Sequence, residues 1–392
     1  MIGLVAILAC GGGEEAAPPA ALAPVSRDFA RNPALVARLV AHPHSYFRFI
    51  NRAFSQSVCE RFRDQIRAMP AVNLHGDAHV EQYAVTDHGR GLTDFDDSSA
   101  GPNVIDLVRF GVSLALAAQQ RGWDDRTDEL VGAFLAGYRA ALADPHRRPG
   151  EPAVVARMRS GFAGDRTDKL AAVSRELSPI ALDAQAMMER PLARYAATIR
   201  AERPELPRHF FDRVAIGRLH AGVGSALDEK YVIRVQGRTP APGDDVLLEA
   251  KELRRLDGIE CLDTSRRADP FRILVVESRI AYTPHRYIGY ARWRDKTFWI
   301  HAWDDHYSEL DIADTPRTAD DLREVAFDAG VQLGRGHPYQ IADPLERQLR
   351  AELLEDLARL EPDVRAAIRD LSREVVASWE HFRRDMAARA GR

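Results

Sequence analysis

The sequence predicts an α+β protein in which helices and strands occupy separate parts of the chain. Two observations predict this class: apolar residues recur with helical spacing near both ends of the chain, and they follow a strand-like pattern in the middle. The alternation of strands and helices that a parallel sheet needs is missing. We therefore expect an antiparallel sheet that follows a helix-rich segment and precedes a helical C-terminus.

The first half of the chain is predicted to be mostly helical. Pro70 ends the first helical pattern, because proline removes a backbone donor and clashes with the preceding turn. Two short strands, 71–75 and 91–94, flank a loop rich in polar residues. The expected helical segments are 26–69, 104–120, 126–142 and, in pieces, 143–210.

The second half begins with segments that have strand periodicity and turn residues between them. These expected strands are 214–219, 231–236, 246–253, 272–282, 286–293 and 297–302. From residue 318 onward the pattern is again helical. The expected parts of the chain are a signal and tether (1–24), a helix-rich lobe (25–210), an antiparallel β lobe (211–305) and a C-terminal helical segment (306–392).

The composition excludes two classes of protein. Apolar residues make up 45% and charged residues 29% of the chain, which excludes global disorder. The formal net charge of −4 argues against a dedicated nucleic-acid binder, which carries a basic excess. Only four of the 54 basic residues are lysines, so a lysine among apolar residues is informative.

The first 24 residues differ from the rest of the chain. A short apolar run ends at Cys10, and small residues, two glutamates and an Ala/Pro-rich stretch follow it. This pattern resembles the end of a bacterial lipoprotein signal, in which Cys10 carries the lipid anchor and residues 11–24 form a tether. We expect an exported, membrane-anchored protein, with a cytoplasmic protein as the alternative. The two other cysteines, Cys59 and Cys261, are too few for a disulfide framework and lack metal-ligand spacing.

A cluster of acidic and histidine residues is the main functional signal. It consists of two motifs, L-H-G-D-A-H and L-T-D-F-D-D, separated by about a dozen residues. Carboxylates at the ends of adjacent buried strands repel each other unless a cation lies among them, and a hard divalent ion such as Mg²⁺ is an economical counter-charge. The alternative is a turn-rich hairpin whose aspartates bind the backbone. The residues of the cluster are His75, Asp77, His79, Asp94, Asp96 and Asp97.

These motifs, with the following G-P-x-x-x-D-L-x-R-F, resemble the bacterial family called domain of unknown function 2252. They are in turn similar to the catalytic and metal loops of aminoglycoside-phosphotransferase-like kinases. The resemblance implies that Asp77, in a catalytic motif shared with His79, accepts the proton of an attacking hydroxyl. It also implies that Asp94 holds Mg²⁺ against nucleotide phosphates and that Asp96 supports it.

Gln82 departs from the family pattern, which has Asn three residues after the second histidine. Its amide oxygen can also bind a metal, but it lies one methylene farther from the backbone. An octahedral Mg²⁺ site is sensitive to such a shift. Gln82 is therefore a third candidate metal ligand, and it also supports the alternative of a catalytically degenerate protein.

A glycine-rich turn and a lysine form a second constellation. Gly222 and Gly224 allow the backbone to approach a ligand, and its N–H groups can cradle phosphate with help from the Ser225 hydroxyl. Lys251 follows within the strand-like run V-L-L-E-A-K-E-L, among apolar neighbours where an unpaired lysine is rare. A turn, a strand and then a lysine is also the order of parts in a kinase N-lobe. We expect these four residues to bind ATP phosphates; a hairpin turn and a structural ion pair are the alternatives.

Several other residues are predicted to have structural roles. His75 is expected to bind the loop backbone, Asp106 to cap or brace the helix that it begins, and Arg48 to lie on the surface. The aromatic and acidic residues between 299 and 306 are interpreted as a packed sheet edge. The lysines predicted to be solvated are Lys169, Lys230 and Lys296.

The resemblance implies a two-lobed, kinase-like fold in which the order of the lobes is permuted. In ordinary kinases the glycine-rich sheet precedes the catalytic loop, whereas here it follows. Permutation is tolerable because chain termini usually lie at the surface.

The leading hypothesis is an ATP- and Mg²⁺-dependent phosphotransferase that binds a nucleotide and an unidentified small-molecule or protein acceptor, with no nucleic-acid partner. One alternative is a degenerate, pseudokinase-like nucleotide binder. Another is a metal-dependent phosphohydrolase, in which His75, Asp77 and His79 share one face of a strand or Asp94 is a nucleophile with Asp96 as acid/base.

Overall fold

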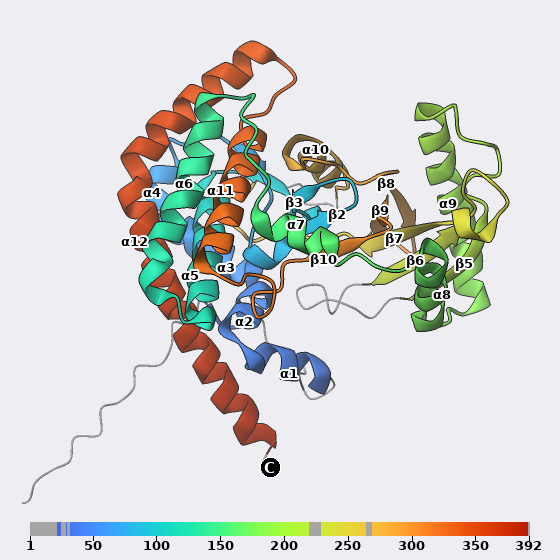
Figure 1. Cartoon of the computed structure of the whole chain (residues 1–392), viewed down its shortest axis with the longest axis horizontal. Coiled ribbons are helices and arrows are strands. Elements are labelled where there is room, and N and C mark those ends of the chain that lie inside the picture. Colours follow the sequence, from blue (N-terminus) through green and yellow to red (C-terminus); the bar gives the residue numbers. More distant parts are fainter. Residues whose placement is uncertain (1–21, 25–28, 30–31, 219–228, 264–268, 391–392) are drawn as a thin grey trace, which may run out of the picture.

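The computed structural model describes residues 22–24, 29, 32–218, 229–263 and 269–390, and it consists of two lobes. A helical lobe contains the N-terminal and C-terminal parts of the chain. A sheet lobe contains most of the middle part and lies beside the helical lobe (Figure 1). Each lobe has a hydrophobic core of its own.

The helical lobe is built from segments that are far apart in the sequence. Four short helices precede the motif region, α5 and α6 follow it, and the last helices pack across them. Their bounds are α1 (Pro33–Ala41), α2 (Pro43–Phe49), α3 (Asn51–Arg61), α4 (Arg63–Ile66), α5 (Val104–Arg121), α6 (Thr127–Ala143), α7 (Ala153–Ser160), α10 (Phe271–Ile280), α11 (Ala319–Gly336) and α12 (Asp343–Ala390).

Five short strands hold the motif region against these helices. β1 (Val72–Leu74) pairs with β4 (Ser99–Gly101), and β2 (Tyr83–Thr86) lies between β3 (Arg90–Leu92) and β10 (Tyr307–Glu309). All of these pairs are antiparallel. Leu74 pairs with Ser99 and Tyr83 with Leu92, so the connecting segments 75–82 and 93–98 leave from neighbouring strand ends.

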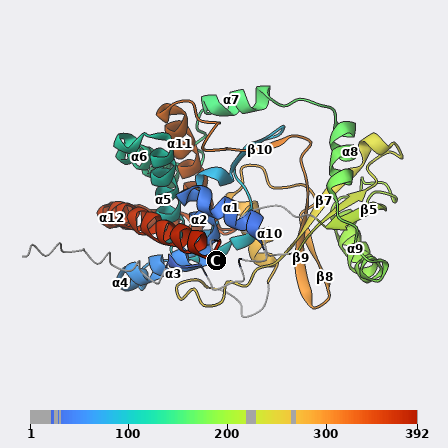
Figure 2. The ribbon, with the colours of Figure 1, turned by 90° about the horizontal axis from the view of Figure 1, so that it is seen from below.

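The sheet lobe is a five-stranded antiparallel sheet with a helix on each face. The strand order is β5-β6-β7-β9-β8. The helices α8 and α9 lie beside the sheet, as Figure 2 shows. The bounds are β5 (Arg213–Arg218), β6 (Lys230–Val235), β7 (Val246–Glu252), β8 (Gly289–Trp293), β9 (Lys296–Ala302), α8 (Arg166–Glu176) and α9 (Leu182–Glu202).

The two faces of this sheet have different partners. Leu248 and Ala250 of β7 pack in the core that includes Tyr195 of α9, whereas Leu247 packs with Leu170 of α8. Side chains alternate along a strand, so Glu249 and Lys251 lie on the same face as Leu247. The register places Trp299 of β9 opposite Lys251 on this face. Trp299 belongs to the core of the helical lobe, so this face of the sheet is turned toward that lobe.

The predicted strand at 272–282 is wrong, because this segment forms the helix α10. The run of β-branched residues favoured a strand. However, the buried residues Ile273, Val276 and Ile280 recur with the spacing of one helix face, and they pack in the core of the helical lobe. The helices α8 and α9 also differ in place from the expected lobe ending at residue 210, since both pack on the sheet.

α6 and α11 pack closely because small residues lie between them. A Cβ atom on Gly137 would collide with the carbonyl oxygen of Phe327, and one on Gly330 with that of Phe134. Such glycines allow the two backbones to approach more closely than larger side chains permit. The contact fixes the position of the C-terminal end of α11, which reaches the motif region.

Cys59 of α3 and Cys261 form a disulfide, which the count of cysteines did not predict. Cys261 lies in the connection between β7 and α10, so the bond ties this connection to the helical lobe. Among the described helices, none is long and apolar enough to span a membrane. Cys10 and the expected tether lie outside the described residues.

Candidate functional site

A cleft of about 500 Å³ lies between the two lobes. It is bounded by the motif loops of the helical lobe and by the face of the sheet that carries Lys251. The cleft thus combines acidic, basic and aromatic side chains from segments that are distant in the sequence. Its principal lining residues are Arg48, Asp77, Gln82, Asp94, Asp96, Lys169, Lys230, Glu249, Lys251, Arg254, His285, Trp299, His301, Trp303, Asp304 and Glu309.

The loop that carries Asp77 is hydrogen-bonded to Asp106, which lies in the first turn of α5. The fully buried carboxylate of Asp106 accepts hydrogen bonds from the backbone N–H of His75 (2.7 Å) and of Gly76 (2.8 Å). Gly76 has a φ of +80°, and a Cβ here would collide with the carbonyl of Asp97, so this turn requires glycine. Asp106 therefore braces the loop as well as the helix that it begins.

His75 and His337 complete this support. The Nε2 of His75 lies 2.9 Å from the carbonyl oxygen of Thr93, a backbone contact as predicted. His337, at the end of α11, is fully buried and contacts Asp106 through Nε2 at 3.1 Å and the Tyr138 hydroxyl through Nδ1 at 2.9 Å. The end of α11 thereby fixes the loop that carries Asp77.

Asp77 is held by a buried arginine of the same lobe. Arg109 of α5 is fully buried, and its Nε donates a hydrogen bond of 2.7 Å to Asp77 Oδ1. Its guanidinium lies over the rings of Phe47 and Phe54. The other oxygen, Asp77 Oδ2, has no hydrogen-bond partner among the described residues and remains accessible to solvent. Burial raises the pKa of Asp77 to about 7, against the opposing charge of Arg109.

His79 lies next to Asp77 in a closed, fully buried position. Its Nε2 is 3.9 Å from Asp77 Oδ2, and neither ring nitrogen has a hydrogen-bond partner among the described residues. Burial, with the nearby charge of Arg48, lowers the pKa of His79 well below its ordinary value. His79 is therefore held as a neutral imidazole beside Asp77, beyond hydrogen-bond distance of its carboxylate.

Asp94 and Asp96 meet Lys251 across the cleft. The Lys251 ammonium contacts Asp94 Oδ1 and lies 3.2 Å from Asp96 Oδ2. Burial alone raises the pKa of Asp94, but the charges of Lys251 and Lys230 outweigh this effect and hold the pKa well below its ordinary value. Burial and the charge of Asp94 raise the pKa of Asp96 to about 6. The structure thus brings the two predicted metal residues and the predicted phosphate-binding lysine to one position.

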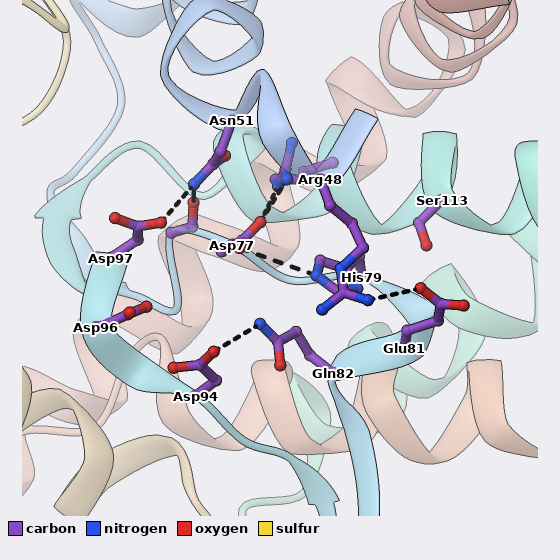
Figure 3. A network of polar contacts seen from close by, with 12 residues as sticks. Arg48, Asn51, Asp77, His79, Glu81, Gln82, Asp94, Asp96, Asp97 and Ser113 are labelled. Atoms are coloured by element: carbon purple, nitrogen blue, oxygen red, sulfur yellow. Dashed lines mark hydrogen bonds and ion pairs between the residues drawn. The ribbon is translucent and has the colours of Figure 1, made fainter. Parts of the chain in front are cut away.

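Gln82 points toward the same position, as Figure 3 shows. Its Nε2 donates a hydrogen bond of 3.3 Å to Asp94 Oδ2, while its buried Oε1 has no hydrogen-bond partner among the described residues. A buried acceptor without a donor is costly, and a bound water or ion is one way to satisfy it. In the described part of the chain, no group of three or more His, Cys, Asp or Glu side chains is placed to hold a metal ion.

Lys230 was wrongly predicted to be solvated, because it is buried and lines the cleft. Antiparallel pairing places it directly opposite Lys251, so both ammonium groups lie on the same face of the sheet. Burial and the charge of Lys251 lower the pKa of Lys230. The expected strand began at residue 231, just after Lys230, and the register that makes Lys230 and Lys251 neighbours is visible only in the fold.

Three further predictions of surface or edge positions are also wrong. Arg48 lines the cleft, where its Nη1 donates a hydrogen bond of 2.8 Å to Glu81. Lys169 also lines the cleft, and its ammonium contacts the backbone carbonyls of Asp304 and Asp305. The aromatic strand β9 lies between β7 and β8, so it is not an edge strand. By contrast, Lys296, the other lysine predicted to be solvated, is partly exposed and forms an ion pair with Glu252 at 2.8 Å.

One further expectation is wrong, and another lies outside the described residues. His75, Asp77 and His79 do not share a strand face, since β1 ends at Leu74 and the chain turns at Gly76. Gly222, Gly224 and Ser225 lie outside the described residues.

Comparison with known proteins identifies one family that matches this chain. The family described as "Uncharacterized protein conserved in bacteria (DUF2252)" matches residues 27–189 and 164–385. No curated protein and no solved structure matches the chain.

Proposed function

The chain belongs to this family of uncharacterized bacterial proteins, and we propose that its cleft binds ATP with Mg²⁺ and transfers the γ-phosphoryl group to a hydroxyl acceptor. The observation that carries the proposal is the meeting of Lys251 with Asp94 and Asp96 in a cleft that Asp77 also lines. Phosphoryl transfer depends on this combination of a phosphate-binding cation, metal-binding carboxylates and a carboxylate near the nucleophile. The acceptor is an unidentified small molecule or protein.

The residues near Asp94 fit a hard divalent cation. Asp94, Asp96 and Gln82 offer carboxylate and amide oxygens, which Mg²⁺ prefers, and Gln82 Oε1 lacks a donor among the described residues. Mg²⁺ commonly uses only one or two protein carboxylates and completes its shell with phosphates and water. When bound, the ion would neutralise charge on the phosphate oxygens.

Lys251 and Lys230 provide positive charge for these phosphates. Burial lowers the pKa of Lys251, but the charges of Asp94 and Asp96 outweigh it and raise the pKa well above its ordinary value. Lys251 therefore remains an ammonium in the cleft. A metal ion bound to Asp94 and Asp96 would replace Lys251 as their counter-charge, which frees Lys251 to bind a phosphate oxygen.

Asp77 is placed to accept the proton of the acceptor. In the proposed reaction the hydroxyl oxygen forms a bond to the γ-phosphorus while the bond from phosphorus to the bridging oxygen breaks, and Asp77 Oδ2 takes the proton. Arg109 binds Oδ1 and leaves Oδ2 accessible. A pKa of about 7 suits a general base near neutral pH.

Calorimetric titration with a non-hydrolysable ATP analogue and Mg²⁺ tests the proposal. Lys251→Ala should weaken binding at least about tenfold, which corresponds to about 1.4 kcal/mol. Lys296→Ala is a matched control, because Lys296 lies on the same sheet and pairs with Glu252 but does not line the cleft. Equal affinity of wild type and Lys251→Ala would remove Lys251 from the site and contradict the proposal.

A catalytically degenerate nucleotide-binding protein is the second candidate function. Gln82 favours it, because this longer side chain stands where the family pattern has Asn and already donates a hydrogen bond to Asp94. Mg²⁺-dependent binding of labelled ATP, without phosphate transfer to any added hydroxyl compound, to the protein or to water, would support this candidate. Transfer restored by Gln82→Asn would identify the substitution as its cause.

A further inference from the structure

A second polar centre lies in the cleft, and none of the roles proposed above involves it. Glu277 of α10 is fully buried, and its Oε1 accepts two hydrogen bonds from His285: from the backbone N–H (2.7 Å) and from ring Nδ1 (2.7 Å). A buried carboxylate requires a compensating partner. His285 provides both donors from a single residue.

This arrangement fixes the tautomer of His285 and leaves its other nitrogen available. Because Nδ1 carries the hydrogen that binds Glu277, Nε2 is the nitrogen that faces other partners. Nε2 has no hydrogen-bond partner among the described residues, and it remains accessible to solvent in the cleft. Burial lowers the pKa of His285, but the charge and hydrogen bond of Glu277 outweigh it and raise the pKa. When the ring is protonated, Nε2 offers an N–H donor to the cleft.

The surroundings of His285 provide an aromatic wall, and the carboxylates of Asp304 and Glu249 add to the effect of Glu277 in raising its pKa. The His285 ring lies 4.1 Å from the ring of His301, which stacks on Trp299 at 4.5 Å and an interplanar angle of 24°. Lys169 lines the same cleft, and its ammonium is bound by backbone carbonyls, with no carboxylate within 4 Å among the described residues.

We propose that His285 Nε2 binds an anionic oxygen, from a carboxylate or a phosphate group, of the molecule that receives the phosphoryl group. The identification of this molecule as the acceptor rests on the proposed function, whereas anion binding at His285 does not. The buried Glu277 holds the imidazole in one orientation, so His285 is a binding residue and Glu277 a positioning residue.

Another histidine of the same chain provides a matched control. His306 is also held by a carboxylate through its backbone N–H (2.8 Å) and ring Nδ1 (2.9 Å), in this case by Asp87. It stacks on Phe162 and does not line the cleft. The two histidines therefore share the carboxylate contact and differ in access to the cleft.

Histidine-ring NMR of the full chain tests the proposal without nucleotide or metal. The ring signals are assigned through His285→Asn and His306→Asn, and sodium phosphate and sodium acetate are titrated separately at constant ionic strength. We expect the His285 Nε2 signal to shift and saturate at millimolar anion, while the His306 signal shifts less than a third as far. Saturation by phosphate alone or by acetate alone identifies which anion the site takes.

Two variants separate this proposal from the proposed function. Glu277→Gln should weaken anion binding at least about fivefold while the His306 signal is unchanged. Lys251→Ala should leave the His285 titration unchanged even when it abolishes nucleotide binding. Absence of saturation in the wild type, equal shifts at His285 and His306, or loss of the His285 titration in Lys251→Ala would overturn the proposal.

Discussion

Asp77 and Asp94 lie on the same wall of the cleft, yet their cations come from different parts of the molecule. Arg109, the partner of Asp77, belongs to the helical lobe and is enclosed by Phe47 and Phe54. Lys251, the partner of Asp94, comes from the sheet lobe. The first ion pair is therefore independent of the sheet lobe, whereas the second exists only where the two lobes meet.

This difference assigns the two ion pairs different physical roles. The Asp77–Arg109 pair is internal to one core, so it maintains the position and the protonation behaviour of Asp77. The Lys251 contact borders a cleft into which water and ligands can enter. Under the proposed function, a bound cation would replace Lys251 there without disrupting either hydrophobic core. The first pair is therefore expected to affect stability, and the second mainly ligand binding.

The largest expected effect is the loss of stability caused by Arg109→Ala. Removal of one member of a buried ion pair leaves an uncompensated charge and costs about 3–5 kcal/mol. Urea denaturation should show this loss, and Lys251→Ala should cost clearly less because water in the cleft can solvate Asp94 and Asp96. Equal losses of stability in the two variants would contradict the assignment of a structural role to the Asp77–Arg109 pair alone.

The next effect concerns the disulfide that ties the β7–α10 connection to α3. This connection carries Arg254, which forms an ion pair of 2.9 Å with Asp97 of the motif region. Cys59→Ser should lower the free energy of unfolding by about 2–4 kcal/mol, since the bond closes a long loop of the unfolded chain. Thermal or urea denaturation with and without reductant measures this change. Reductant should destabilise the wild type and leave Cys59→Ser unaffected; a wild type insensitive to reductant contradicts the prediction.

The last effect is a change in how stability depends on pH, caused by Asp77→Asn. The pKa of Asp77 is raised from 3.8 to about 7 on folding, so the folded state binds a proton that the unfolded state has lost. This contribution to stability is complete below about pH 4 and is lost as the pH rises to about 7, with a slope of at most about 1.4 kcal/mol per pH unit. Urea denaturation at intervals between pH 5 and pH 8 should show that Asp77→Asn lacks this decline. Parallel profiles of the two proteins would refute the raised pKa.

The sequence predicted the cluster of motif residues and most of the secondary structure around it. The order of helices and strands follows from hydrophobic periodicity. The two short strands expected around the motifs do not pair with each other, because β1 pairs with β4 and β3 with β2. Lys251 was recognised because an ammonium in an apolar strand is unusual. In each case a local pattern carried the information.

The parts that could not be predicted depend on register and on contacts between distant segments. Lys230 becomes part of the cleft only through its pairing with Lys251. Glu277 lies in a segment that was predicted as a strand, and its contact with His285 requires the helix α10. Local propensity favoured the strand there, but packing against the helical lobe determined the structure.

Substitutions at the glycines between α6 and α11 are expected to disturb the distant loop that carries Asp77. α6 carries Tyr138, which binds His337 at the end of α11, and His337 in turn contacts the carboxylate of Asp106 beneath the Asp77 loop. A methyl group on Gly137 or Gly330 would separate the two helices and displace that series of contacts. The spacing of two helix backbones therefore sets how accurately Asp77 is positioned, so residues that have no reactive groups can influence the cleft without lining it.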